Sequence, residues 1–351
     1  MNIGRKRPAF TLIELMIVIV IIAILAGLTT IGTRIAIQKT KVATVSLTME
    51  QLSMAIEKYK TDIGEYPPDF TDLDAVARHI RKRWPRCEFP DVQTFLSEAA
   101  AQFYVPEDPE ATPFGPTSAL VFWLGGLLNE NGKPQGFFLS PTNPLGGSGS
   151  SQREEPRFDF PDGTIVSGKC SFSRVGETKK FEGPAFQVGK DDSKPLVYFC
   201  ASAPAENYLS DDMELENAAY QVPMDPDADD PKIVVKYCVF KRIGRAVPYS
   251  KNSNGYWTWH EPERFQLIHP GQDGLFSATD RDKTYGQGII SIKFDDKDDP
   301  DRLTEVSPLS PYPCTWFGTA EVPDNTLTKE DDDNIVSFAE GGTLESLYPE
   351  K

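Results

Sequence analysis

The chain begins with one long hydrophobic segment. Residues 10–28 read FTLIELMIVIVIIAILAGL, and Glu14 is the one ionisable side chain among them. A helix needs about 20 apolar residues to cross a bilayer, so this pattern predicts a transmembrane helix over residues 10–28. Arg5, Lys6 and Arg7 stand just before it, and basic residues favour the cytoplasmic side. The rest of the chain is therefore expected outside the cytoplasm.

The helical pattern continues past this segment but becomes amphipathic. No proline occurs between Phe10 and Tyr66, and Gly64 followed by two prolines gives the stop signal. We therefore predict one helix over residues 10–63, whose amphipathic part, 29–63, needs a sheet to cover an apolar stripe. The stripe recurs at alternating steps of three and four, which is the spacing of one helix face. Its members are Val42, Val45, Met49, Leu52, Ile56, Tyr59 and Ile63.

Shorter elements follow the long helix. Patterns opened by an Asp or Thr that can cap a first turn predict helices over residues 72–82, 91–103 and 117–128. Runs of β-branched and aromatic residues between turn signals predict strands over residues 164–172, 196–201, 233–240, 265–269 and 288–294. This order predicts an α+β fold, in which the long helix packs on an antiparallel sheet within a globular domain of residues 64–351.

The charge balance limits the possible partners. The 351 residues carry a formal net charge of −16. Nucleic-acid binding needs a basic surface, so this charge argues against a nucleic-acid partner. It suits a soluble domain outside the cytoplasm, and solubility alone explains most of it.

The cysteines give a weaker signal. All five are widely spaced, without a C-x-x-C pair, which argues against a zinc site. Disulfides are permitted outside the cytoplasm, and Cys200 and Cys238 lie in predicted strands that are candidates for neighbours. Buried free thiols explain these residues equally well.

The start of the hydrophobic segment carries a family resemblance. A basic leader followed by Ala9-Phe10-Thr11-Leu12-Ile13-Glu14-Leu15 resembles the prepilin-type cleavage and methylation signal of type IV pilins and type II secretion pseudopilins. The resemblance implies that residues 1–9 are a leader, that a prepilin peptidase cuts between Ala9 and Phe10, and that the new amine of Phe10 is methylated. The family's usual residue before the cut is Gly, and this chain has Ala9, another small residue.

Glu14 has a physical interpretation that agrees with the resemblance. A carboxylate in lipid is costly, and the Phe10 amine of a neighbouring subunit, shifted along the axis, would pair with it in a low dielectric. Two alternatives stay open: Glu14 is hydrated near the interface, or it pairs with its own N-terminus. A secretory signal peptide is the rival for the whole segment. The charge inside the apolar region and the uninterrupted helix after it argue against that rival.

A second stretch supports the same family. Tyr59-Lys60-Thr61-Asp62-Ile63-Gly64-Glu65-Tyr66-Pro67 resembles the sequence after the long helix of the major pseudopilin of type II secretion. The resemblance implies a pilin-like fold and a structural subunit of a periplasmic pseudopilus, not an enzyme. Such a subunit is a single-pass inner-membrane protein that assembles with copies of itself, minor pseudopilins and the inner-membrane secretion platform. Because the chain is longer than a typical major pseudopilin, we expect insertions near residues 140–195 and 281–328.

A loop near the C-terminus resembles the calcium loop of the same family. There a strand is followed by G-x-D-G and an acidic pair; here Gly271-Gln272-Asp273-Gly274 follows a predicted strand. Calcium needs six to eight oxygens, so Asp273 with Asp332 and Asp333 would form a site if the two segments meet. The favoured alternative is an ordinary turn at Asp273 and a solvated acidic run around residues 330–333.

Two other functions remain. A type IV pilus subunit shares every N-terminal feature described above. A binding or hydrolytic domain anchored outside the cytoplasm by a pilin signal is the alternative from a different class, and Tyr256, Trp257, Trp259 and Trp316 are its candidate sugar-stacking residues. The chain has no H-E-x-x-H, no G-x-S-x-G and no phosphate-binding glycine loop, so no catalytic residue is assigned.

Overall fold

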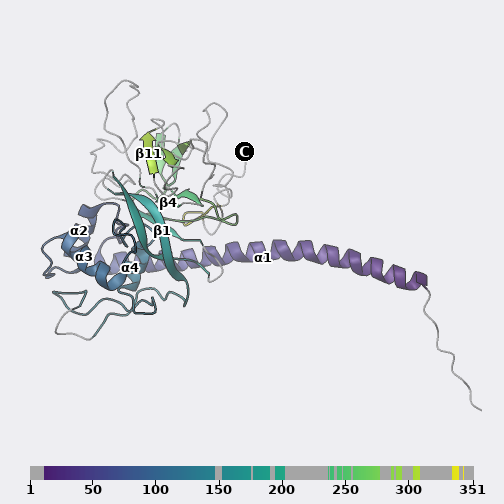
Figure 1. Cartoon of the computed structure of the whole chain (residues 1–351), viewed down its shortest axis with the longest axis horizontal. Coiled ribbons are helices and arrows are strands. Elements are labelled where there is room, and N and C mark those ends of the chain that lie inside the picture. The colour runs from purple at the N-terminus through teal and green to yellow at the C-terminus, as the bar shows by residue number, and fades with distance from the viewer. Residues whose placement is uncertain are drawn as a thin grey trace, which may run out of the picture. The chain divides into compact units, whose positions relative to one another are not determined.

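The computed structural model of the chain is shown in Figure 1. It describes residues 12–146, 152–174, 177–189, 194–201, 236, 238–240, 243–246, 248–253, 256–276, 286–287, 290–294, 303–308, 334–339 and 343. The chain divides into two compact units, Met1–Ala43 and Thr44–Lys351.

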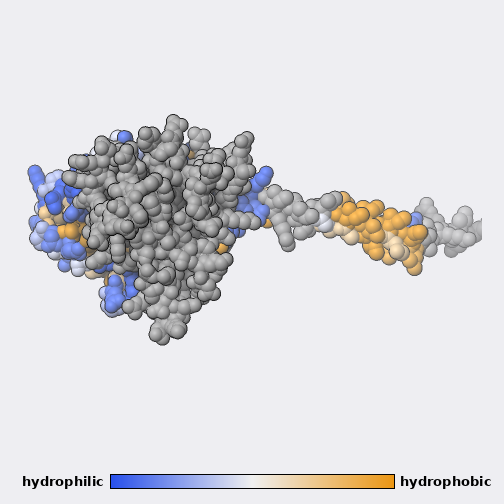
Figure 2. Space-filling model, turned by 90° about the horizontal axis from the view of Figure 1, so that it is seen from above, coloured by the Kyte–Doolittle hydropathy of each residue, from blue (hydrophilic) through white to orange (hydrophobic). Residues whose placement is uncertain are grey.

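The first element is a single long helix, α1, from Leu12 to Ile63, and its 52 residues fall within the predicted range of 10–63. Its large apolar side chains between Leu12 and Leu25 are all exposed, from 48% for Val18 to 77% for Leu12. Figure 2 shows them as a hydrophobic surface on this part of α1. Among the residues that the structure describes, no helix meets the length and apolarity of a membrane span. The span over residues 10–28 therefore stays a prediction.

The later part of α1 is amphipathic and belongs to the second unit. Five stripe residues are buried in that unit: Val45, Met49, Leu52, Ile56 and Tyr59. Val42 and Ile63, at the two ends of the stripe, are half-buried, whereas Glu50 and Lys58 on other faces are exposed. Steps of three and four keep these apolar side chains on one face, which is the face that packs into the core.

Three short helices follow: α2 (Leu73–Arg83), α3 (Val92–Phe103) and α4 (Ala119–Gly125). The Asp72 and Asp91 side chains cap α2 and α3 by accepting backbone N–H bonds, as their positions predict. α4 is shorter than the predicted helix over residues 117–128. Gly126 adopts a φ of 78°, a left-handed conformation that a glycine permits and that ends the helix.

The largest sheet has the strand order β2-β1-β4-β5. β1 (Ile165–Arg174) and β2 (Glu177–Phe186) form a hairpin with ten paired positions, and β4 (Cys238–Phe240) and β5 (Gly244–Ala246) extend it on the β1 side. The whole hairpin lies inside the expected insertion of 140–195. β2 was not predicted, because its sequence ETKKFEGPAF contains a lysine pair and a Gly-Pro step that strands usually avoid.

Three smaller sheets complete the described fold. One has the order β12-β8-β3, from β3 (Val197–Cys200), β8 (Phe265–His269) and β12 (Ile335–Val336), and every residue of these strands is buried. β6 (Ser250–Ser253) pairs with β7 (Tyr256–Trp259). β9 (Gly286–Gln287), β10 (Ile290–Phe294) and β11 (Leu303–Pro308) form the last sheet, within the second expected insertion. All strand pairs are antiparallel, so the α+β prediction is confirmed for the described residues.

One sequence prediction about the cysteines is wrong. Cys200 lies in β3, whose partner strand is β8, whereas Cys238 lies in β4, whose partners are β1 and β5. The pairing of β4 with β1 brings Cys238 next to Cys170 instead, with their Sγ atoms 2.9 Å apart. Strand-like sequence alone does not say which strands share a sheet, and here the two belong to different sheets.

Candidate functional site

The predicted assembly residue, Glu14, lies in the first turn of α1. Its side chain is exposed, and so are those of Ile13 and Leu15 on either side. A carboxylate near a helix N-terminus interacts favourably with the helix dipole. The predicted cleavage and methylation residues, Ala9 and Phe10, lie outside the described residues.

The predicted calcium residue Asp273 lies in a turn directly after β8. Its Oδ1 accepts a hydrogen bond of 2.7 Å from Leu275 N, and Gly274 adopts a φ of 80°. The Lys194 ammonium donates to the carbonyl oxygens of Gly271 and Gln272, each at 3.2 Å. Two backbone oxygens of the turn are therefore already bound by a cationic side chain of the protein itself.

The second half of the predicted calcium site is only partly described. Asp332 and Asp333 lie outside the described residues, but the next residue, Asn334, is buried. Its Nδ2 donates to the Phe276 carbonyl at 2.9 Å, so this segment does reach the turn after β8. Asn334 Oδ1 is buried and accepts no hydrogen bond from the described part of the chain. Within the same residues, no group of three or more His, Cys, Asp or Glu side chains that would hold a metal ion is present.

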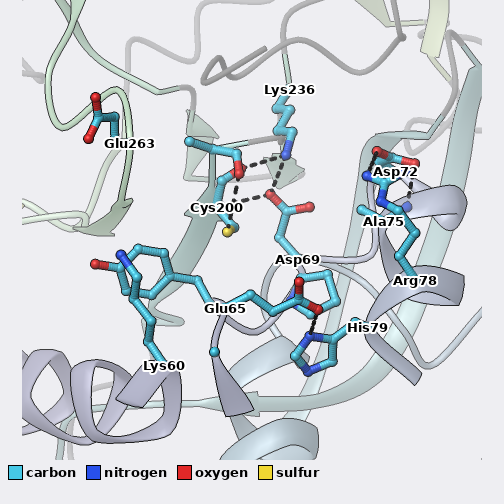
Figure 3. Close-up of a pocket in the computed structure, with 14 residues that line it drawn as sticks. Lys60, Glu65, Asp69, Asp72, Ala75, Arg78, His79, Cys200, Lys236 and Glu263 are labelled. Atoms are coloured by element: carbon cyan, nitrogen blue, oxygen red, sulfur yellow. Dashed lines mark hydrogen bonds and ion pairs between the residues drawn. The ribbon is translucent and has the colours of Figure 1, made fainter. Parts of the chain in front are cut away.

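The second unit contains a cavity of about 310 Å³ with charged residues in its lining, beside the end of α1 (Figure 3). Its wall comes from the turn after α1, from α2, from the end of β3 and from single residues near β4 and β8. Four carboxylates and three cationic side chains line it. They are Glu65, Asp69, Asp72, Glu263, Lys60, Arg78 and Lys236.

A buried ion pair closes one side of this cavity. Lys236 donates to Asp69 Oδ2 at 2.9 Å and to the Cys200 carbonyl at 2.6 Å, and both charged side chains are 2% exposed. Asp69 also accepts from Cys200 N at 2.9 Å and, through Oδ1, from the hydroxyl and the backbone N–H of Thr71. The pair thus joins the loop after α1 to the end of β3. These hydrogen bonds offset the cost of burying two charges.

A hydrogen-bonded relay runs from the core to the cavity wall. Arg83 donates to the Tyr59 hydroxyl at 3.0 Å, which lies 2.6 Å from His79 Nε2, and His79 Nδ1 lies 2.6 Å from Glu65 Oε1. A carboxylate can only accept, so Nδ1–H donates to Glu65, and in a neutral imidazole Nε2 accepts from Tyr59. Burial lowers the pKa of His79 and raises the pKa of Tyr59 to about 12, so both side chains stay neutral at pH 7.

Cys200 is the cysteine among the described residues that line the cavity, and its environment keeps the thiol unreactive. Burial raises the pKa of the Cys200 thiol to about 12, although the nearby Lys236 ammonium acts in the opposite direction. A thiol that stays protonated at neutral pH is a poor nucleophile. The cavity has the mixed charge of a binding site for a small polar ligand, without an activated nucleophile among the described residues.

This cavity was not predicted from the sequence. Asp69 stands between a Pro-Pro pair and an aromatic residue, where it resembles a turn, and Lys236 is one lysine inside a predicted strand. The two are far apart in the sequence, and no local pattern links them. A single lysine in the otherwise largely apolar stretch 233–240 was the available signal, since a lysine at a buried position needs a partner.

Comparison with known proteins assigns the N-terminus. A family model, the prokaryotic N-terminal methylation motif, matches residues 4–30, a stretch that contains Ala9, Phe10 and Glu14. This motif is the prepilin-type signal of pseudopilins and type IV pilins, so the resemblance at the start of the chain is confirmed. It supports a pilin-like class, processing by a prepilin peptidase and an N-terminal membrane anchor. No curated protein and no solved structure matches the chain, so the pilin fold stays a prediction.

Proposed function

Since residues 4–30 carry the prepilin-type signal, we propose that the chain is a structural subunit of a periplasmic pseudopilus of type II secretion. The prepilin peptidase removes residues 1–9, and the mature protein is held in the inner membrane by residues 10–28. The domain after the helix lies in the periplasm. Subunits then assemble with each other, with minor pseudopilins and on the inner-membrane secretion platform to drive protein export.

One observation carries this proposal: the signal continues into a helix whose apolar side chains are exposed on all sides. A helix that is hydrophobic all round needs a nonaqueous neighbour, either lipid or other helices. The side chains from Leu12 to Leu25 have that character. Between Val45 and Tyr59, by contrast, one face of the helix is apolar and buried, and the other faces carry exposed polar residues. A helix divided in this way is suited to anchoring in lipid first and to packing against sister helices afterwards.

Glu14 gives the assembly its axial register. In the apolar core of a bundle of helices, a carboxylate without a cation is costly, and an opposite charge offsets that cost. The methylated amine of Phe10 on an adjacent subunit supplies the charge when the two helices are shifted along the axis. A single polar group in an apolar interface selects one register in this way.

The test compares two substitutions on the same helix. Glu14→Ala is expected to leave membrane insertion intact and to reduce filament yield, because the shifted register loses its ion pair. Glu50→Ala removes an exposed carboxylate from the amphipathic part of α1 and is the matched control. Sheared filaments from cells that overproduce each variant are quantified by immunoblotting, with the membrane fraction as reference. Normal filament yield from Glu14→Ala, or an equal loss from Glu50→Ala, would contradict the role of Glu14.

Filament length separates this function from that of a type IV pilus subunit. The two share the processing signal, so the N-terminus does not distinguish them. A pseudopilin gives a short periplasmic filament at its natural level, whereas a pilin gives an extracellular fibre of micrometre length. Electron microscopy of cells at natural expression decides between them.

The cavity beside α2 is the observation that favours the other class, an anchored extracytoplasmic binding or hydrolytic domain. Its mixed charges suit a small polar ligand. Thermal-shift screening of the full chain with sugars, amino acids and short peptides tests this alternative. Arg78 lines the cavity and its side chain is 47% exposed, so a saturable shift that Arg78→Met abolishes would favour it over a purely structural subunit.

Calcium at Asp273, Asp332 and Asp333 remains part of the proposal. The buried Asn334 Oδ1, which has no hydrogen-bond donor within the described part of the chain, supports it, since calcium prefers such amide and carboxylate oxygens. The Lys194 ammonium on the Gly271 carbonyl opposes it, because two cations at one turn repel each other. We therefore expect weak binding in the wild-type chain.

A further inference from the structure

Two cysteines distant in sequence meet in the largest sheet. Cys170 lies in β1 and Cys238 in β4, and their Sγ atoms are 2.9 Å apart although 68 residues separate them. Cys238 is completely buried and Cys170 is 9% exposed. All cysteines that the structure describes are present as free thiols.

The strand register explains the contact. Phe172 pairs with Cys238 and Ser171 with Val239 in the antiparallel ladder of β1 and β4. Successive side chains of a strand point to opposite faces, so Cys170 and Phe172 share a face, and Cys238 lies on that face too. Cys170 and Cys238 are therefore diagonal neighbours across the two strands, at a range over which side chains interact.

We propose that Cys170 and Cys238 form a redox pair that closes into an intrachain disulfide under oxidising conditions, locking β4 onto β1. The closure in cells rests on the proposed function, because only a domain outside the cytoplasm meets an oxidising compartment. The oxidant is a dithiol–disulfide exchange protein or a small-molecule disulfide.

The chemistry is an ordinary pair of exchange steps. The thiolate of one cysteine attacks a sulfur of the oxidant's disulfide, forms a mixed disulfide and releases one thiolate of the oxidant. The thiolate of the second cysteine then attacks the mixed disulfide, so the Cys170–Cys238 bond forms and the oxidant leaves reduced, as a dithiol protein or as two small thiols. Two protons and two electrons pass from the cysteine pair to the oxidant.

The burial of the pair fixes when this exchange occurs. Burial raises the pKa of the Cys238 thiol, and the adjacent Cys170 thiol raises it further, so the Cys238 thiolate is scarce in the folded protein. The exchange therefore takes place while the strands are still accessible, during folding. Once β4 is in place, the same burial protects the disulfide from reductants in solution.

The other described cysteines provide controls. The Cys200 thiol donates to the Ala201 carbonyl at 3.4 Å and belongs to a different sheet, and Cys87 is half-buried in the loop after α2. Neither lies in the sheet that holds the pair. Cys200→Ala is the matched control, because it removes a buried strand thiol without touching Cys170 or Cys238.

The experiment uses the full chain in detergent micelles, refolded with either oxidised glutathione or a phosphine reductant. Free thiols are alkylated in denaturant, and proteolytic peptides are identified by mass spectrometry. A linked peptide pair containing Cys170 and Cys238 is expected in the oxidised sample, in the wild-type chain and in Cys200→Ala. Alkylation of both residues after oxidative refolding, or linkage of either one to Cys200, would overturn the proposal.

Thermal unfolding gives a second readout that does not depend on peptide recovery. Oxidation should raise the midpoint of the wild-type chain by about 4–10 °C, since the bond closes a long loop of the unfolded chain. Cys170→Ala and Cys238→Ala should lose this dependence on oxidant, and Cys200→Ala should keep it. An unchanged dependence in Cys170→Ala would also overturn the pair.

The same assay on protein purified from cells separates this inference from the proposed function. A disulfide in both the cellular and the refolded protein supports the pair and the oxidising compartment. A disulfide in the refolded protein alone still supports the pair, and it contradicts the periplasmic location of the domain.

Discussion

Because Lys236 and Asp69 form a buried ion pair, replacing Lys236 by an uncharged side chain of similar shape should strongly lower the thermal stability of the protein. Lys236→Met keeps a long unbranched side chain but removes the ammonium. The Asp69 carboxylate, 2% exposed, would keep its bonds to Thr71 and Cys200 N but lose its only charged partner among the described residues. The Cys200 carbonyl would lose its bond to Lys236 as well.

The expected magnitude follows from the cost of an uncompensated buried charge. Removing one partner of a buried pair costs about 3–5 kcal/mol. In a unit of this size, each kcal/mol shifts the midpoint of thermal unfolding by about 2 °C. Lys236→Met should therefore lower the midpoint by roughly 6–10 °C.

A surface lysine provides the comparison. Lys180 is 44% exposed and lies 3.1 Å from both Asp108 and Glu110, so Lys180→Met also removes an ammonium from acidic partners. Water screens these exposed pairs, and the expected shift is at most about 2 °C. Circular dichroism of the full chain in detergent measures both variants. If Lys236→Met shifts the midpoint no more than Lys180→Met, the buried pair does not hold the loop after α1 to β3.

Two further predictions concern pH and calcium. Because burial lowers the pKa of His79, the unfolded chain takes up a proton before the folded chain does. The free energy of unfolding should start to fall as the pH drops through about 6.5, the pKa of histidine in the unfolded chain. It should stop falling once the pH is below the pKa of His79 in the folded chain. His79→Gln should flatten urea-unfolding midpoints between pH 7.5 and 5.5; an unaltered slope would refute the neutral imidazole. For calcium, Lys194→Ala should bind about tenfold more tightly than wild type in titration calorimetry, because the competing ammonium is gone from the Gly271 carbonyl. Asp273→Asn in the Lys194→Ala background should lose that gain, and equal affinities of wild type and Lys194→Ala would show that the ammonium does not compete.

Features set by local sequence were predictable. The apolar stripe of α1 needs only the period of a helix, and its five members from Val45 to Tyr59 are buried as that period requires. The caps at Asp72 and Asp91 likewise depend on neighbouring residues alone.

Features set by long-range pairing were not predictable. The partner of Cys238 depends on whether β4 joins β1 or β3, and nothing within either strand encodes that choice. The Asp69–Lys236 pair joins residues 167 positions apart, so no spacing rule identifies it. β2 was missed because its lysines and its Gly-Pro step are unusual in strands. Its partner β1 stabilises it through ten paired positions, which the sequence of β2 alone does not reveal.

The mature N-terminus is the most direct test of the proposed function. Intact-mass and N-terminal peptide analysis of the membrane-extracted protein should find a chain that begins with N-methylated Phe10 and lacks residues 1–9. A chain that still begins with Met1, or one cut at another site, would contradict processing as a prepilin and with it the assembly that depends on the Phe10 amine.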